Sequence, residues 1–321
     1  MKAPPNPKEP SSMSQLDVHA IWPAGGSAAP LQRERVATRC VCCGSAHLEG
    51  APAVLMPFLA HRVFGWEPVV IDESWNLRTI PSGHAYSICR SLHCPDCGHL
   101  FLDIRFDDVD MQRLYEGYRG EAYTALRQRY EPDYGRRNVV YGGIIPWLQD
   151  VEAFLDPYLP SAPRVLDWGG DTGKNTPFRS RCSAHFVYDI SHIPLVEGAR
   201  QVTREEAVQV APDLVICSNV LEHVPYPHEL LAEIALVMSR DAIFYVEVPF
   251  EDLMREDGPA PHGRKKHWHE HINFFSEQSL VRVLNASGFE VLAKQVLCTA
   301  FDGRDVFQLQ VACRLAQSGE R

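Results

Sequence analysis

The sequence lacks any apolar stretch long enough to cross a membrane. A membrane helix requires about 20 consecutive apolar residues, and no run in these 321 residues approaches that length. The first 30 residues are rich in Pro, Ser, Ala and Gly and lack the apolar core of a signal peptide. We therefore expect a cytoplasmic protein without a membrane partner, and a disordered tail over residues 1–36.

Long basic blocks are also missing. The chain has 31 Lys and Arg against 41 Asp and Glu, which gives a formal net charge of −10. An acidic surface repels a phosphate backbone, so we expect no nucleic-acid partner. The length suffices for one large α/β domain and a smaller one.

The ten cysteines include two C-x-x-C pairs, and each pair is followed by glycine. Such pairs in a cytosolic protein favour metal ligation over disulfides. Four thiolates close a tetrahedral zinc site, which makes the metal structural. The wide spacing between the pairs costs on the order of 1 kcal/mol, whereas a structural zinc contributes roughly 10–16 kcal/mol. The predicted zinc ligands are Cys40, Cys43, Cys94 and Cys97.

Alternatives to this ligand set remain open. Cys42 lies within the first pair and can replace either of its members, and His93 or His99 can substitute in the second. Two unrelated pairs of reduced thiols are the remaining interpretation. We assign the zinc-binding module to residues 37–105.

Residues 106–145 change in character and form a predicted helical linker or lid. Tyrosine and arginine alternate there more densely than a plain surface helix requires. The segment either roofs a pocket and contacts an anionic or sugar-like substrate, or forms a solvated helix with interface tyrosines.

A glycine-rich turn follows a predicted buried strand at 165–167. The strand ends on an acid, and the glycines predict a tight turn into a helix, where a ligand contacts bare backbone. An acid at this position repels a pyrophosphate but suits a cationic nucleoside, S-adenosylmethionine (SAM). A second strand ends on another acid 22 residues later (189 − 167), placed for ribose hydroxyls. The predicted cofactor residues here are Asp167, Gly169, Gly170, Gly173 and Asp189.

Strand and helix patterns alternate over residues 146–321, which predicts a mostly parallel sheet. Residues 213–223 are a buried strand followed by a polar turn that begins near Asn219 and ends at His223. That turn emerges at the carboxyl end of the sheet, where open α/β sheets bind ligands. We add Asn219 to the cofactor residues. The last two strands predict an antiparallel edge hairpin.

The glycine turn resembles the first motif of class I SAM-dependent methyltransferases, with Asp171 in place of the middle glycine. The run Leu221-Glu222-His223-Val-Pro is similar to their fourth motif. The resemblance implies an α/β, Rossmann-like class I methyltransferase fold over 146–321, preceded by the small zinc-binding module. Its sheet is seven-stranded and mostly parallel with an antiparallel edge. SAM is the implied cofactor.

Residues 38–315 resemble a narrower family, the zinc-containing sugar C-methyltransferases. By position, Glu270 and His271 match that family's acid–base pair and His223 matches a pocket histidine, so these are the predicted catalytic residues. Trp268 replaces the family's tyrosine. The family continues into a second α/β domain that this chain lacks after Arg321. The implied activity is methylation of a small metabolite, a sugar or natural-product intermediate, at carbon by analogy and otherwise at oxygen or nitrogen.

Other interpretations of the same residues compete. His267, His269 and His271 alternate along the chain and, in an extended segment, lie on one side as a metal site; a loop with a capping or solvated histidine is the third interpretation. For the whole chain, the alternatives are an NAD-linked oxidoreductase and a non-catalytic binding protein that keeps the fold.

Overall fold

The computed structural model describes residues 33–191 and 193–317. The predicted tail lies outside the described residues up to position 32. Arg33, at its end, bonds through its guanidinium to the carboxylates of Glu229 and Asp108. Within the described ranges, no helix is both long and apolar enough to span a bilayer.

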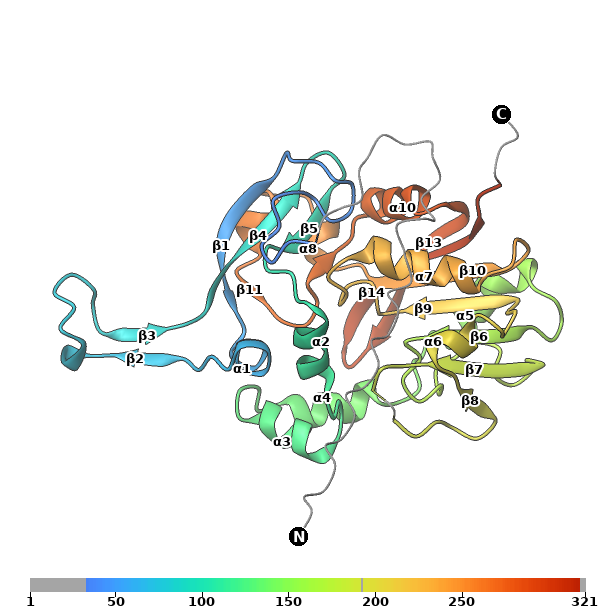
Figure 1. Cartoon of the computed structure of the whole chain (residues 1–321), viewed down its shortest axis with the longest axis horizontal. Coiled ribbons are helices and arrows are strands. Elements are labelled where there is room, and N and C mark those ends of the chain that lie inside the picture. Colours follow the sequence, from blue (N-terminus) through green and yellow to red (C-terminus); the bar gives the residue numbers. More distant parts are fainter. Residues whose placement is uncertain (1–32, 192, 318–321) are drawn as a thin grey trace, which may run out of the picture. The chain divides into compact units, whose positions relative to one another are not determined.

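A seven-stranded sheet forms the centre of the C-terminal half (Figure 1). Five neighbouring strands, up to one edge of the sheet, are parallel, and the remaining two join antiparallel as the predicted hairpin at the other edge. The predicted fold is therefore confirmed. The strands, in spatial order, are β13 (Phe289–Phe301), β14 (Arg304–Leu315), β10 (Ile243–Pro249), β9 (Leu214–Ser218), β6 (Arg164–Trp168), β7 (Ala184–Tyr188) and β8 (Ala199–Gln201).

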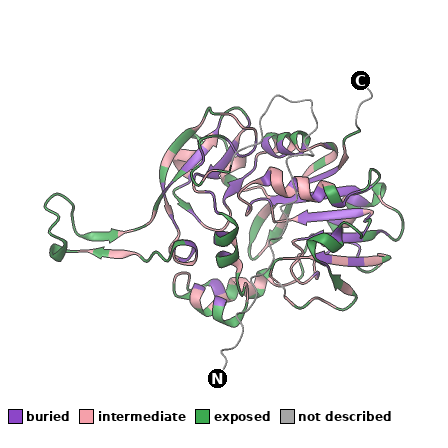
Figure 2. Cartoon of the chain, in the orientation of Figure 1, coloured by how far each residue is buried: buried purple, intermediate pink, exposed green. Residues whose placement is uncertain are grey.

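Alternate residues of these strands bury opposite faces, as the two-residue period of a strand requires. On one face, Leu214 and Ile216 of β9 pack with helix α5 (Leu148–Leu155). On the other face, Val215 and Cys217 pack in a cluster with α7 (Pro227–Val237) and α10 (Glu277–Ala286). The inner strands β10, β9 and β6 are largely buried in Figure 2.

A second, five-stranded sheet forms the N-terminal module. Its centre is β1 (Glu49–Leu55), β4 (Ile88–Cys94) and β5 (His99–Leu102). Its edges are β11 (His267–Trp268) and β12 (Asn273–Phe274), which come from the loop between β10 and α10. The loop that carries Glu270 and His271 therefore completes the sheet of the module.

The predicted lid consists of three short helices, α2 (Asp108–Tyr115), α3 (Glu121–Gln128) and α4 (Tyr134–Tyr141). Their buried residues share a core with α1 (Pro57–Phe64) and the module sheet. The hairpin β2 (Val69–Ile71) and β3 (Gly83–Ala85), with the short helix η2 (Glu73–Trp75) at its tip, extends away from this core (Figures 1 and 2). The remaining short helices are η3 (Asp156–Tyr158), α6 (Arg204–Ala207), α8 (Asp252–Arg255) and α9 (Pro261–Arg264).

The prediction of a helix directly after the glycine turn is wrong. Residues 169–183, all described, form consecutive turns between β6 and β7. Pro177 lies in the middle of this short connection, where it lacks an N–H donor and disfavours helical backbone at the residue before it. Phe178 then has a left-handed φ of 60°, which also ends any helix.

Candidate cofactor and catalytic site

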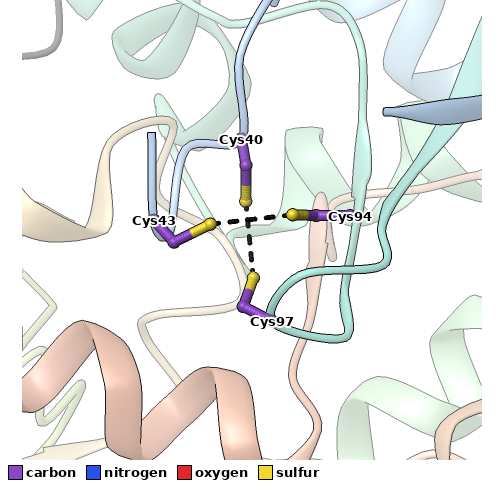
Figure 3. Close-up of side chains that lie close together, drawn as sticks. All are labelled: Cys40, Cys43, Cys94 and Cys97. Carbon is purple, nitrogen blue, oxygen red and sulfur yellow. Dashed lines mark hydrogen bonds between the residues drawn. The ribbon is translucent and has the colours of Figure 1, made fainter. Parts of the chain in front are cut away.

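The four predicted zinc ligands converge on one point (Figure 3). Their sulfur atoms all lie within 4.8 Å of one another, and Sγ of Cys40 is 3.6 Å from Sγ of Cys97, as Sγ of Cys43 is from Sγ of Cys94. Zn–S bonds of about 2.3 Å in a tetrahedron place sulfurs about 3.8 Å apart. The four thiols thus fit a structural zinc ion.

Each knuckle is closed by its glycine, because Gly44 donates to the carbonyl of Cys40 and Gly98 to that of Cys94. Both glycines have φ near 75°, a conformation that a side chain would penalise. Cys42 points elsewhere, since its thiol donates to the Ser279 carbonyl at 3.1 Å.

The glycine turn lies against the turn that follows β9. Gly169 has a φ of 84°, and a Cβ built on it would lie 2.5 Å from Cγ2 of Val220. Gly173 has a φ of 72°, and its Cβ would lie 2.9 Å from the ring of His185. The close packing on both sides requires glycine at these two positions.

Asp167 lies beneath the turn and is 5% exposed. Its Oδ2 accepts a 2.5 Å hydrogen bond from Thr176, whose hydroxyl is 2.9 Å from Nε2 of His185. A Cβ on Gly170 would lie 2.5 Å from the Asp167 carboxyl carbon. Burial raises the pKa of Asp167 to about 7. This geometry makes Asp167 a support of the turn, which departs from the expectation that it faces a ligand.

Asp189 follows β7 and borders a surface hollow of about 580 Å³. Its Oδ2 accepts from the backbone N–H of Asp171 at 2.9 Å, and its Oδ1 accepts from the backbone N–H of Ser191 at 2.7 Å. The carboxylate is thereby held at the rim of the hollow. The lining residues are Tyr188, Asp189, Gln201, Val202, Thr203, Arg204, Glu205 and Glu206.

Asp171 turns toward the lid. Its Oδ2 accepts from Nη1 of Arg119 at 2.8 Å, and its buried Oδ1 has no hydrogen-bond partner in residues 33–191 and 193–317. Both residues have left-handed backbone, with φ of 54° for Asp171 and 59° for Arg119. Burial raises the pKa of Asp171 against the pull of Arg119.

Asn219 ends β9 with a φ of 55° and faces the sheet interior. Its Nδ2 donates to Ser218 Oγ at 3.1 Å and to Glu247 Oε1 at 3.2 Å. Glu247 is fully buried and also accepts from Trp147 and Ser218, and from Tyr245 and Gln310. Asn219 thus belongs to a buried polar network beneath the site.

Two predicted catalytic residues meet beside Glu222. The rings of His223 and His271 are 4.6 Å apart and nearly perpendicular. Asn273 joins the loop of His271 to the turn of His223. Its Nδ2 donates to the carbonyls of Leu221 and Val224, and its backbone N–H donates to the carbonyl of Glu222. Sequence reasoning gave Asn273 no role.

The pKa values of His223, His271 and Glu222 are shifted from their ordinary values. Burial and the neighbouring His271 lower the pKa of His223 to about 3. Burial works to lower the pKa of His271, but the carboxylates of Glu251, Glu222 and Glu270 raise it. Burial raises the pKa of Glu222 to about 7.

Glu270 does not orient His271 through its carboxylate, which corrects the expected pairing. Both oxygens accept from Nη2 of Arg127, at 2.7 and 2.8 Å. Although burial opposes ionisation, Arg127 holds the pKa of Glu270 well below its usual range. Only the backbone carbonyl of Glu270 faces the pocket, 3.0 Å from Nδ1 of His223.

The three alternating histidines do not converge as a set. His269 and His271 have ring centroids 4.8 Å apart, whereas His267 is exposed on β11. Trp268 is fully buried in the module and donates from Nε1 to Ser91 Oγ at 2.8 Å. The aromatic side chain that reaches the pocket is Tyr115 of α2, edge-on to His223 with centroids 6.1 Å apart.

Residues 145–294 match the family model described as "Methyltransferase domain". A comparison with curated proteins found no match. Among solved structures, a Burkholderia thailandensis 1,6-didemethyltoxoflavin-N1-methyltransferase with bound S-adenosylhomocysteine is 20% identical; the alignment covers 70% of this chain and 99% of that chain with a TM-score of 0.44.

Two further solved structures are less similar in sequence. A glycopeptide N-methyltransferase complexed with sinefungin is 14% identical, with 52% of this chain and 93% of that chain covered and a TM-score of 0.41. A magnesium protoporphyrin IX methyltransferase from Synechocystis with bound S-adenosylhomocysteine is 13% identical, with 59% and 97% covered and a TM-score of 0.39. Residues 145–294, a little under half of the chain, are thus similar to a methyltransferase domain.

Proposed function

We propose that the protein transfers the methyl group of SAM to a small molecule, with SAM held along the glycine turn and its adenosine in the hollow beside Asp189. One observation carries this proposal: a bare-backbone turn and two carboxylates, Asp189 and Asp171, share the carboxyl edge of the sheet. Oδ2 of Asp189 accepts one hydrogen bond and has a lone pair left for a ribose hydroxyl, whereas Oδ1 already accepts two from Ser191. The negative charge at this edge attracts the sulfonium and ammonium groups of SAM.

The same edge is unfavourable for NAD. A dinucleotide fold binds its pyrophosphate at the N-terminus of the helix that follows the glycine turn. Residues 169–183 contain turns in place of that helix, and the flanking carboxylates repel phosphate. Both features support SAM over a dinucleotide.

The acceptor is proposed to bind beside His223 and His271. Methyl transfer is an in-line displacement, so the protein mainly positions the acceptor and removes its proton. We assign removal of the proton to His271 and positioning of the methyl acceptor to His223, whose Nδ1 lies against the Glu270 carbonyl. Glu270 contributes through Arg127, which fixes the loop that carries His271. The proposed acceptor class is a sugar or natural-product intermediate, methylated at carbon by analogy with the resembling family or else at oxygen or nitrogen.

The knuckle cysteines are proposed to hold a structural zinc ion remote from methyl transfer. Four thiolates leave no open coordination position. A cytoplasmic location, where thiols stay reduced, agrees with this assignment.

The test is mass spectrometry of candidate acceptors after incubation with the enzyme and methyl-labelled SAM. We expect one acceptor class to gain a single labelled methyl group. His271→Ala should lower turnover by about a hundredfold or more while SAM affinity stays within threefold. His84→Ala, in the exposed β2–β3 hairpin, is the control and should leave both unchanged. Equal losses of turnover and SAM affinity in His271→Ala would remove His271 from the proposal.

A further inference from the structure

Glu222, His223 and His271 form a cluster that the methyl-transfer reaction alone does not explain. One ligand atom from each lies within 4.8 Å of the other two. Two imidazoles and one carboxylate are a donor set that holds divalent cations and leaves coordination positions open.

Glu222 gives the strongest indication of a missing partner. The residue is 2% exposed, and neither of its buried carboxylate oxygens has a hydrogen-bond donor within the part of the chain that the structure describes. A buried carboxylate is costly unless it is paired or coordinates a metal. The nearest ring nitrogen is Nε2 of His223, 3.9 Å from Oε1, which is too far for a hydrogen bond.

The hydrogen bonds of His223 fix which nitrogen faces Glu222. Nδ1 lies 3.0 Å from the carbonyl oxygen of Glu270, an acceptor only, so Nδ1 carries the hydrogen. Nε2 of the neutral ring then keeps its lone pair, and this is the nitrogen beside Glu222. Metal-binding histidines almost always donate their other N–H to a carbonyl or carboxylate in this way.

His271 also lies beside a carboxylate other than that of Glu222. Its Nδ1 faces Oε1 of Glu251 at 3.7 Å. The loop that carries His271 is fixed by backbone hydrogen bonds from Ile272 and Asn273 to the carbonyl of Glu222. His223 thus has a hydrogen-bonded outer partner and His271 has Glu251 at ion-pair distance, whereas no donor among the described residues bonds to the Glu222 carboxylate between them.

We propose that Glu222, His223 and His271 bind a divalent cation. This inference deepens the proposed function and rests on it for one consequence: the open positions of the cation take an oxygen of the acceptor. A bound cation lowers the pKa of a coordinated hydroxyl. The acceptor class then narrows to small molecules with a hydroxyl or enolisable carbonyl oxygen at or beside the methylated atom. With the cation bound, His271 is a ligand and gives up the role of base assigned to it above, so the acceptor's proton passes to solvent; His271 is the base only in the cation-free site.

A second cluster provides an internal control. Glu49, His93 and His262 also bring their ligand atoms within 4.8 Å of one another. Glu49 is exposed to solvent, so its carboxylate requires no buried partner. Comparing Glu222→Gln with Glu49→Gln therefore distinguishes cation binding at the buried cluster from binding at an exposed cluster with the same residue types.

The experiment is a titration of the zinc-loaded full-length protein with Mn²⁺, followed by the electron paramagnetic resonance signal of free Mn²⁺. Mn²⁺ prefers oxygen and nitrogen ligands and competes poorly for thiolates. We expect one bound Mn²⁺ per chain, an affinity at least about tenfold weaker in Glu222→Gln, and no change in Glu49→Gln.

Thermal melting without Mn²⁺ shows whether Glu222→Gln folds, and its melting temperature should rise because the change removes a buried unpaired charge. His271→Ala should lose Mn²⁺ as well. Wild-type affinity in Glu222→Gln, or loss of the ion only in Glu49→Gln, would overturn the inference. Methyl transfer that persists without Mn²⁺ binding overturns the cation site alone, whereas Mn²⁺ binding without SAM binding overturns the proposed function.

Discussion

At the scale of single residues, Asp167 has a different task from the other acids at this edge of the sheet. It is buried under the glycine turn, where only Thr176 bonds its Oδ2. Its folded pKa of about 7 exceeds the ordinary value of 3.8. The folded state therefore keeps a proton that the unfolded state releases between about pH 4 and pH 7.

Stability contributed by this proton is fully present below about pH 4 and is lost as the pH rises through 7. The difference between the two pKa values corresponds to at most ~4 kcal/mol. We expect Asp167→Asn to flatten the decline in unfolding free energy over this range and to make the protein more stable than wild type at pH 8. Urea unfolding at pH 5 and pH 8 measures this.

The exposed Asp305→Asn is the matched control and should follow the wild-type pH profile. A steeper decline in Asp167→Asn than in wild type would show that the carboxylate is ionised in the fold.

The sequence placed the acids but not their partners. Hydrophobic periodicity located Asp167 and Asp189 at the ends of strands, whereas His223 and His271 were predicted from the resemblance to the sugar C-methyltransferases. The partners of two other acids, Asp171 and Glu270, are arginines 52 and 143 positions earlier in the chain. A contact between such distant residues leaves no mark in local pattern, so the predicted Glu270–His271 pairing was wrong.

At the scale of elements, helix α3 and the loop between β10 and α10 are joined by Arg127 and Glu270. Arg127 is 3% exposed, lies over the ring of Tyr134 at 4.2 Å, and also faces Glu131 at 3.2 Å. We expect Arg127→Met to destabilise the fold by about 3 kcal/mol, because the partly buried Glu270 carboxylate loses its charged partner.

Glu270→Gln combined with Arg127→Met should recover part of that loss. Urea unfolding of both single variants and the double variant yields the coupling energy. Arg129→Met, on the same lid segment and exposed, is the control. An additive double variant would mean that the pair does not fix the loop.

Helices and strands were predicted correctly where the hydrophobic periodicity was strong. The prediction failed where a single residue opposed the structure that the pattern indicated. Ser276 precedes the amphipathic helix α10, and its Oγ accepts a hydrogen bond from the backbone N–H of Ser279, as a serine before an apolar helical pattern predicts. The glycine turn was predicted to enter a helix, and Pro177 prevents it. The lid was predicted from its tyrosines, yet Tyr123 and Tyr134 are buried in the core of the module.

At the scale of the whole molecule, the cysteine cluster shares a core with the larger sheet. Cys40, Cys94 and Cys97 pack in the same cluster as buried residues of α7 and α10. The module sheet also takes strands β11 and β12 from the loop that bears His271. Loss of the metal should therefore disturb the proposed pocket of His223 and His271 indirectly, through the shared core and sheet.

We expect Cys97→Ser to lower zinc content from one to near zero per chain and to reduce the melting temperature, since a structural zinc contributes roughly 10–16 kcal/mol. Elemental analysis and thermal melting measure the two effects. Cys42→Ser is the matched control, because its thiol bonds to the Ser279 carbonyl, and it should keep its zinc. Zinc loss in Cys42→Ser and retention in Cys97→Ser would contradict the proposed ligand set.

The central claim is that the glycine turn and its carboxylates bind SAM. Calorimetric titration of the zinc-loaded protein with SAM, and separately with NAD, tests it directly. The account predicts one SAM site per chain, no detectable heat from NAD, and an affinity at least about tenfold weaker in Asp189→Ala, which loses a charge-assisted ribose hydrogen bond. Binding of NAD in place of SAM, or no SAM binding by folded protein that retains its zinc, would contradict it.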